Sequence, residues 1–240
     1  MEQFRAPAGG VLLVDKPQGW TSFDVVKKVR GTLRVKKVGH AGTLDPMATG
    51  LLVLCSSGMT KKIDAFQALG KVYEGRMMLG AVTPSYDAET EPQDLRPLGN
   101  IDAIRIRSEV EVFLGDIEQL PPMYSAVKVD GRRLYKLARK GLEVERRPRT
   151  VTIERFDIDE VALPEVAFSV HCSKGTYVRS LAHDLGQRLG CGAYLSALRR
   201  TAIGNFDVDE AWSIEDISTY GREKDQSSDR SKEPPRAGVS

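Results

Sequence analysis

Compact apolar runs alternate with amphipathic stretches along the 240-residue chain. Val11 to Val14 and Leu51 to Cys55 are runs of the kind that form buried strands. The pattern predicts further strands over residues 72–79, 127–129, 151–158 and 166–172. Neighbouring strands interrupted by helices predict an α+β fold, with a mixed and mostly antiparallel central sheet flanked by helices.

Three stretches have the periodicity of amphipathic helices. Thr21 or Ser22 can cap the first, whose apolar stripe contains Val25, Val26, Val29 and Leu33. The other two are predicted over residues 102–114 and 176–189. In the last helix the apolar stripe runs through Val178 and Leu181, so Arg179 points elsewhere.

The chain contains no internal repeat and no interdomain linker before its last residues. Residues 1–220 are therefore expected to form one domain. Residues 221–240 carry Val239 as their one aliphatic side chain larger than alanine. Such a segment cannot bury enough surface to offset its ordering entropy, so a disordered tail is predicted there.

The composition argues for a cytoplasmic protein. No stretch approaches the roughly 20 apolar residues that span a bilayer, and the N-terminus lacks the pattern of a secretory signal. Cys55, Cys172 and Cys191 are odd in number and far apart, which indicates reduced thiols rather than disulfides or a zinc site. We therefore expect a cytoplasmic protein with no membrane association and no metal.

The net charge of +2 conceals a strong polarisation. Six Lys or Arg residues and no acid lie between residues 27 and 37, and nine basic residues oppose three acids between residues 128 and 149. Residues 87–118 reverse the balance, with nine acids against three arginines. The pattern suits a protein that presents a positive face to a polyanion, although solvated helix faces would explain it equally well.

The densest candidate for chemistry is the run GHAGTLDPMATG, at residues 39–50. Its glycines and its Asp-Pro step predict an irregular loop that brings His40 and Asp45 close together. Taken alone, such a run is more often an inert turn. The common signatures of phosphate loops, metalloproteases, serine hydrolases and Rossmann folds are absent from the chain.

Two further residues stand out as candidates. Arg179 lies in the first turn of a predicted helix, where the helix dipole disfavours a cation, so it either serves a site or forms an ordinary surface ion pair. Tyr73 lies at the centre of the predicted strand KVYEGR, where a place in the core of the sheet is the simpler explanation.

The order of six motifs resembles the bacterial TruB family of tRNA pseudouridine synthases. From residue 10 to residue 217 they are DKPQGWTS, GHAGTLDPMATGLL, KVYEG, PPMYSAVKVDGRRLYKLARKG, KGTYVRSLAHDLG and YLSALRRTAIGNF. Sister families keep the Leu-Asp pair but usually place Arg before it, whereas Thr43 and Pro46 favour the TruB branch. The resemblance implies the pseudouridine synthase fold.

The resemblance also implies roles for individual residues. Asp45 corresponds to the catalytic aspartate, Tyr73 to a tyrosine that stacks near the target base and can move a proton, and Arg179 to the partner of the aspartate. Tyr177 and Leu198 correspond to residues that line the base pocket. His40 corresponds to a histidine that helps to extrude the nucleotide, and Lys16, with Pro17, to a motif that supports the active-site loop.

The basic segment at residues 122–150 corresponds to the family's RNA-gripping insertion, with Lys128, Arg132, Arg133, Lys136 and Arg139 as its expected RNA-binding residues. The implied reaction isomerises uridine 55 in the T-arm of tRNA, without cofactor or metal. Most family members continue into a C-terminal PUA module, whereas this chain is expected to be a short, monomeric form without it. An RNA-binding or RNA-folding module with secondary or lost catalysis is the alternative.

Overall fold

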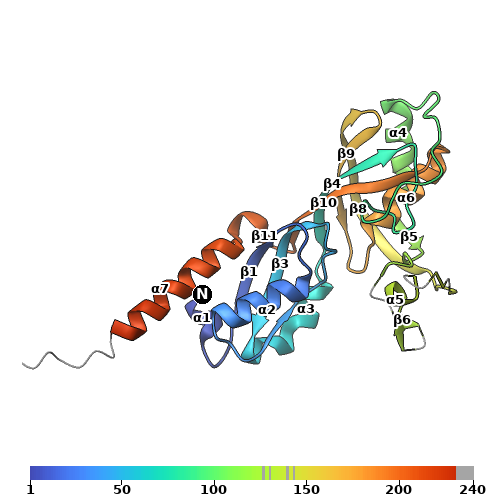
Figure 1. Ribbon diagram of the computed structural model, residues 1–240. Helices are drawn as coiled ribbons and strands as arrows, with labels where there is room; N and C mark the ends of the chain where they lie inside the picture. The colour runs from blue at the N-terminus through green and yellow to red at the C-terminus, as the bar shows by residue number, and fades with distance from the viewer. Residues whose placement is uncertain (126–127, 130, 139–140, 143, 231–240) are drawn as a thin grey trace, which may run out of the picture.

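A nine-stranded sheet runs through the molecule and provides the frame of the site (Figure 1). The computed structural model describes residues 1–125, 128–129, 131–138, 141–142 and 144–230, with the backbone alone at 128, 129, 132, 133, 136 and 225–230. The order along the main path is β1-β3-β10-β4-β9-β8-β5, while β2 pairs with β3 and β11 with β10. Neighbouring strands are antiparallel except β3 and β10, which run parallel. The predicted α+β class is confirmed.

The strands are β1 (Val11–Lys16), β2 (Val38–His40), β3 (Thr49–Ser56), β4 (Lys71–Leu79), β5 (Gly115–Gln119), β8 (Arg149–Ala162), β9 (Glu165–Cys172), β10 (Ala193–Ile203) and β11 (Phe206–Asp207). A separate small hairpin pairs β6 (Lys128–Val129) with β7 (Arg132–Arg133). The α-helices are α1 (Glu2–Arg5), α2 (Ser22–Thr32), α3 (Ile63–Ala68), α4 (Ala103–Val110), α5 (Leu134–Ala138), α6 (Val178–Leu189) and α7 (Ile214–Arg230). Three 3-10 turns are η1 (Ser57–Lys62), η2 (Glu111–Phe113) and η3 (Val208–Glu210).

Strand β3 is buried on both faces, which explains its continuous apolar sequence. Leu52 and Leu54 face a core that includes residues of α2 and α7, whereas Leu51 and Val53 face a core that includes residues of α3. Helix α2 begins at a capping box in which Thr21 and Asp24 satisfy each other's backbone N–H groups. The start of α2 is therefore well defined, and the loop between β2 and β3 is bonded to it through Leu44.

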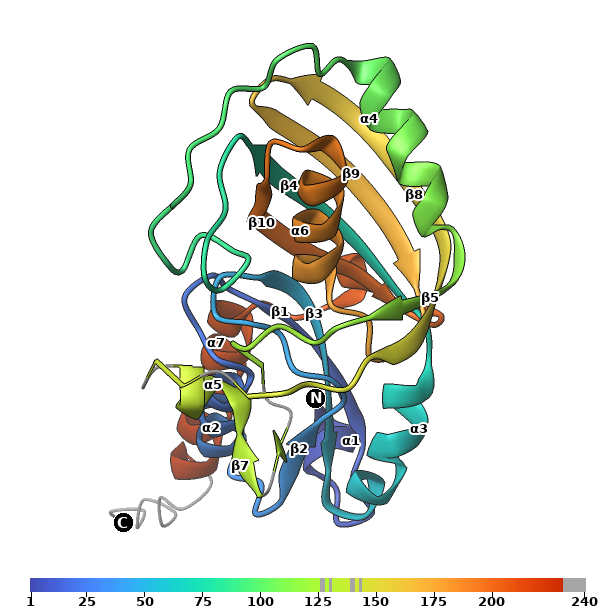
Figure 2. The same cartoon turned by 90° about the vertical axis from the view of Figure 1, so that its right-hand side faces the viewer.

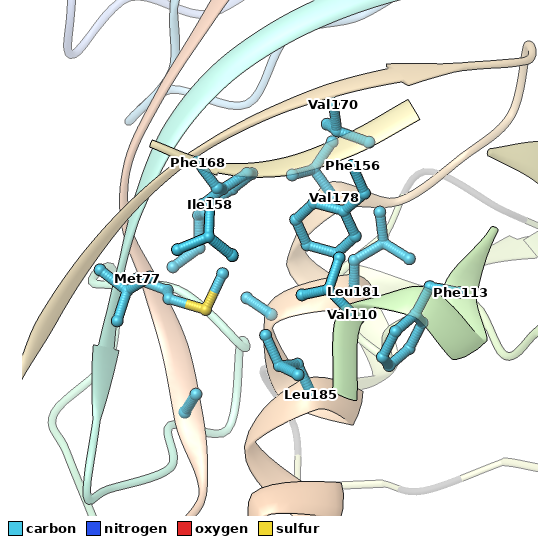
Figure 3. Close-up of a cluster of buried hydrophobic side chains, with 14 of the residues drawn as sticks. Met77, Val110, Phe113, Phe156, Ile158, Phe168, Val170, Val178, Leu181 and Leu185 are labelled. Atoms are coloured by element: carbon cyan, nitrogen blue, oxygen red, sulfur yellow. The ribbon is translucent and has the colours of Figure 1, made fainter. Parts of the chain in front are cut away.

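Helices α4 and α6 lie on one face of the other half of the sheet (Figure 2). The apolar side of α6, including Leu181 and Leu185, packs with Met77 of β4 and Phe168 of β9 (Figure 3). Leu181 and Leu185 are fully buried. Burial of each such side chain contributes about 1.5–3 kcal/mol to the free energy of unfolding. This packing fixes the position of α6 and thereby the direction of Arg179.

Most predicted elements are confirmed, with small shifts at their ends. The helix predicted over residues 102–114 is α4 followed by η2, and the helix predicted from residue 176 begins at Val178. Of the strand predicted at 127–129, residues 128–129 form β6 and residue 127 lies outside the described residues. Strand β10, in the middle of the sheet, was not among the predicted elements.

Part of the predicted disordered tail, residues 221–230, is helical. Helix α7 continues through Arg230, while residues 231–240 lie outside the described residues. Gly221 is buried against Thr32 of α2, and Lys224 forms an ion pair with Glu2. Composition alone missed these contacts with the N-terminal region. Among the described residues, no helix is both long and apolar enough to cross a membrane.

Candidate active site

A pocket of about 560 Å³ lies where the Asp45 loop, β4, β10 and the start of α6 converge. Its lining includes five of the residues that the sequence singled out, namely Asp45, Tyr73, Tyr177, Arg179 and Leu198. They come from four segments that are far apart in the chain. The structure therefore brings the principal predicted site residues together in one cavity.

Asp45 lies on the loop between β2 and β3, next to the buried Leu44. The Leu44 N–H donates to Ser22 Oγ at 2.9 Å, which ties the loop to the first residue of α2. On the other side, Gly50 has φ 101°, and a Cβ there would lie 2.3 Å from the Arg200 carbonyl oxygen. The loop is therefore anchored at both ends, and glycine permits its close approach to β10.

Lys16 supports the same loop from beneath. Its side chain is fully buried, and its ammonium donates to the carbonyl oxygens of Trp20 (2.6 Å), Pro17 (3.1 Å) and Pro46 (3.3 Å). Burial lowers the Lys16 pKa to about 8, although the negative charge of Asp45 opposes this. Lys16 is not part of the pocket lining, so its geometry suits a supporting position rather than a contact with a ligand.

Arg179 forms the electrostatic centre of the site. Its side chain is 4% exposed, with Nε 2.9 Å from Asp45 Oδ2 and Nη1 3.2 Å from Asp87 Oδ2. The same guanidinium donates to the Ser85 carbonyl at 3.0 Å and to the Tyr124 carbonyl at 2.9 Å. A guanidinium bound on several sides has a fixed orientation, so it also fixes the Asp45 carboxylate.

The Asp45 carboxylate remains accessible from the pocket, because 35% of its side chain is exposed. Burial raises the pKa of this carboxyl, and the negative charge of Asp87 raises it further. The positive charges of Arg179 and Lys16 act in the opposite direction. The site therefore places an acidic oxygen at the surface of a cavity, next to a permanent cation.

Tyr73 lies on β4 opposite Arg200 of β10. Arg200 is 1% exposed, and it donates from Nε to the Leu51 carbonyl (2.8 Å) and from Nη2 to the Gly42 carbonyl (3.2 Å). Its guanidinium carbon lies 6.0 Å from the centroid of the Tyr73 ring. Burial raises the Tyr73 pKa, so the phenol is protonated at neutral pH.

Tyr177 is the residue before α6, and its backbone is bound on both sides by Gln119. Gln119 Nε2 donates to the Tyr177 carbonyl at 3.0 Å, while the Tyr177 N–H donates to Gln119 Oε1 at 2.7 Å. The Tyr177 ring lies beneath the Arg149 guanidinium, with 5.2 Å between the guanidinium carbon and the ring centroid. Leu198, on β10, adds a buried apolar side chain to the lining.

His40 lies on β2, outside the residues that line the pocket. Its side chain is half-buried, and Nδ1 has no hydrogen-bond partner within the described part of the chain. Burial lowers the His40 pKa, so the imidazole is neutral at neutral pH. The sequence predicts that His40 lies near Asp45 in the same loop, and the structure places His40 outside the lining of this pocket.

Four of the five predicted RNA-binding residues lie in the small hairpin and helix that the segment 122–150 contributes. Lys128 is in β6, Arg132 and Arg133 are in β7, and Lys136 is in α5, with their backbone alone described. Arg139 lies outside the described residues. Of the same segment, Ser125 and Arg149 reach the pocket.

The sequence analysis missed three residues that shape the site, namely Asp87, Gln119 and Arg200. Asp87 is 1% exposed, although it belongs to the acidic segment at residues 87–118. Gln119 and Arg200 are each 1% exposed, which is unusual for long polar side chains. Neither spacing nor composition marks such residues, because their partners are distant in the chain.

Comparison with known proteins identifies the family. Residues 30–178 match the model of the TruB family pseudouridylate synthase N-terminal domain, and residues 179–233 match that of the tRNA pseudouridylate synthase B C-terminal domain. The tRNA pseudouridine synthase B of Opitutus terrae is 51% identical over 217 residues, which cover 90% of each chain. That of Flavobacterium johnsoniae is 49% identical over 213 residues, covering 86% of this chain and 93% of its own.

A solved structure with the same fold is that of a Cbf5-Nop10-Gar1 complex. The TM-score is 0.71 at 33% sequence identity, and the alignment covers 91% of this chain but 56% of the other. The family matches and the fold agree with the resemblance that the six sequence motifs carry. The chain therefore belongs to the TruB family of pseudouridylate synthases.

Proposed function

We propose that this chain isomerises uridine to pseudouridine at position 55, in the T-arm of tRNA, with Asp45 as the catalytic carboxylate. The observation that carries the proposal is the pairing of Asp45 with Arg179 at 2.9 Å inside a pocket into which the carboxylate is still exposed. The family membership and the names of the relatives support the reaction and the tRNA substrate.

The reaction requires few functional groups from the protein. The bond between uracil N1 and ribose C1′ breaks, the base rotates, and a new bond forms between C5 and C1′. No redox change occurs and no group leaves the nucleotide. An anionic oxygen beside the sugar can add covalently, stabilise positive charge at C1′ or remove a sugar proton. Asp45 supplies this oxygen, and Arg179 favours its ionised form and fixes its direction.

The target nucleotide has to leave its stack to reach a carboxylate inside a pocket, which costs about a few kcal/mol. Stacking on an aromatic side chain is worth roughly 1–3 kcal/mol per base, and Tyr73 and Tyr177 are the aromatic residues of the lining. Leu198 adds apolar contact for the detached base. The family resemblance assigns His40 to extrusion of the nucleotide, and its position outside this lining is compatible with that role.

The affinity for RNA is assigned to the basic insertion. The insertion at residues 122–150, with Lys128, Arg132, Arg133, Lys136 and Arg139, grips the RNA through its phosphates, which makes binding sensitive to salt. Lys16 positions the catalytic loop.

We propose a monomeric, cytoplasmic enzyme that needs no cofactor. The three buried free cysteines suit a reducing compartment such as the cytoplasm.

The proposal is tested by incubating the protein with an unmodified tRNA transcript and mapping pseudouridine. We expect conversion of one uridine, at position 55, and no conversion in a transcript that carries cytidine there. Modification at another position would overturn the T-arm assignment. Tight binding without any conversion would favour the alternative of an RNA-binding module.

A further inference from the structure

The Ser125 hydroxyl is a polar group of the pocket without a hydrogen-bond partner among the described residues. Ser125 is 4% exposed and belongs to the pocket lining together with Asp45, Tyr177 and Arg179. Its Oγ forms no hydrogen bond within the described part of the chain. A buried hydroxyl without a partner is costly, because it loses its bonds to water and gains none in return.

The position of Ser125 is fixed from two sides. The preceding carbonyl, that of Tyr124, accepts from Arg179 Nη2 at 2.9 Å. The Ser125 carbonyl itself accepts from the Tyr135 N–H, in α5, at 3.0 Å. The backbone at Ser125 is therefore attached both to the guanidinium that orients Asp45 and to the helix of the insertion.

Two other hydroxyl groups of the lining, those of Ser173 and Thr176, have partners within the protein. Ser173 Oγ accepts from the Thr152 N–H at 2.9 Å, and Thr176 Oγ1 donates to the Ser173 carbonyl at 3.0 Å. These hydroxyls have a structural explanation in the free protein. The Ser125 hydroxyl has no such partner in the part of the chain that the structure describes, although its side chain borders the same cavity.

We propose that Ser125 is a substrate-binding residue whose hydroxyl forms a hydrogen bond with the target uridine in the pocket. The inference rests on the proposed function and names one more contact for its substrate. A serine hydroxyl both donates and accepts, so it can pair with the ribose 2′-hydroxyl or with the polar edge of uracil. Binding of the nucleotide then supplies the partner that the free protein lacks.

The proposal predicts opposite effects on stability and on substrate binding. Ser125→Ala removes an unpartnered hydroxyl, so the melting temperature of the free protein should stay the same or rise. The same change should weaken productive binding of an unmodified T-arm stem-loop, raising KM about tenfold while kcat changes less than about twofold. A role in folding alone would lower the melting temperature and leave KM unchanged.

Ser56→Ala provides the matched control. The Ser56 hydroxyl is also fully buried, but it accepts from the Gly10 N–H at 2.9 Å and it is not among the residues that line the pocket. This variant should melt at a lower temperature and keep the wild-type KM.

Binding measurements in the Asp45→Asn background remove turnover and locate the contact. Adding Ser125→Ala should weaken binding of the uridine stem-loop about tenfold, and should not affect a stem-loop in which a three-carbon linker replaces the target nucleotide. With 2′-deoxyuridine at the target, a contact to ribose predicts no further loss from Ser125→Ala, whereas a contact to the base predicts the same tenfold loss.

Equal affinity of Asp45→Asn and of the Asp45→Asn, Ser125→Ala double variant for the uridine stem-loop would overturn the inference. So would a tenfold loss of affinity for the linker stem-loop on adding Ser125→Ala. Failure of the proposed function looks different. In that case the wild-type protein would form no pseudouridine at all.

Discussion

Arg179 Nη1 lies 3.2 Å from Asp87 Oδ2, on the side of the guanidinium that does not face Asp45. Asp87 is itself bound, because its Oδ1 accepts from the Glu89 N–H at 3.0 Å and from the Ser85 hydroxyl at 2.5 Å. The buried cation therefore lies between one fixed acid and one acid exposed to the pocket. We infer that Asp87 positions Arg179, and through it the Asp45 carboxylate.

Replacement of Asp87 with Asn should impair turnover more than binding. The amide keeps the shape of the Asp87 side chain but removes its negative charge, which pairs with Arg179 as the charge of Asp45 does. We expect kcat for pseudouridine formation to fall about 10- to 100-fold, which corresponds to about 1.4–2.7 kcal/mol in the barrier, with little change in KM. Asp157→Asn is the control, since Asp157 forms an ion pair with Arg155, whose side chain is 63% exposed. A wild-type kcat in Asp87→Asn would contradict the positioning role.

Gln119→Leu should destabilise the start of α6. Tyr177, the residue before the helix, has no side-chain cap, and Gln119 satisfies both its N–H and its carbonyl. Loss of two partly buried hydrogen bonds predicts a decrease of about 2 kcal/mol in the free energy of unfolding, measured by urea titration. Thr150→Val, which removes an exposed bond to the neighbouring Glu118, should change it by less than about 0.5 kcal/mol. Equal effects of both variants would argue against the role of Gln119.

Tyr73 tests the proposed stacking. Tyr73→Leu removes the aromatic face and should weaken binding of the uridine stem-loop about tenfold or more, whereas Tyr73→Phe should bind like the wild type. The raised Tyr73 pKa adds a second expectation. Since the phenol stays protonated, no limb of the pH–rate profile below about pH 10 should disappear in Tyr73→Phe. Equal affinity of the Leu and Phe variants would exclude stacking as the function of this ring.

Lys16 should give the protein a measurable dependence of stability on pH. Its pKa in the folded protein is about 8, against 10.5 for an ordinary lysine. Between these values the unfolded chain binds more protons than the folded one, so the free energy of unfolding rises with pH. We expect a gain of about 1–3 kcal/mol from pH 7.5 to pH 10 in the wild type relative to Lys16→Met. Lys71, with a pKa also near 8, is present in both proteins and cancels. Parallel pH profiles would contradict this account of Lys16.

Local sequence signals predicted much of the fold. Thr21 caps the start of α2 through a capping box that lies within four residues of the sequence. Strand β3 has a continuous apolar sequence, which is typical of a strand buried on both faces. Arg179 was recognisable because a cation in the first turn of a helix breaks a local rule. The family resemblance predicted that Arg179 pairs with Asp45, and the structure places the two side chains in contact.

Features that depend on distant contacts were not predictable in this way. Strand β10 was missed because two register shifts break the alternation of its buried positions, which fall at residues 193, 195, 198, 200 and 203. One of these is Arg200, whose partners are backbone carbonyls of the loop and strand around Asp45. Asp87 and the extension of α7 were missed for the same reason, since partners elsewhere in the fold explain both.

The most direct test of the account is pseudouridine formation by Asp45→Asn. The amide preserves the size of the side chain and removes the anionic oxygen beside Arg179. We predict that this variant remains folded, binds the unmodified transcript with an affinity close to that of the wild type, and converts no uridine in a prolonged incubation with excess enzyme. Conversion by the folded variant at a rate comparable to that of the wild type would contradict the central claim that the Asp45 carboxylate carries out the reaction.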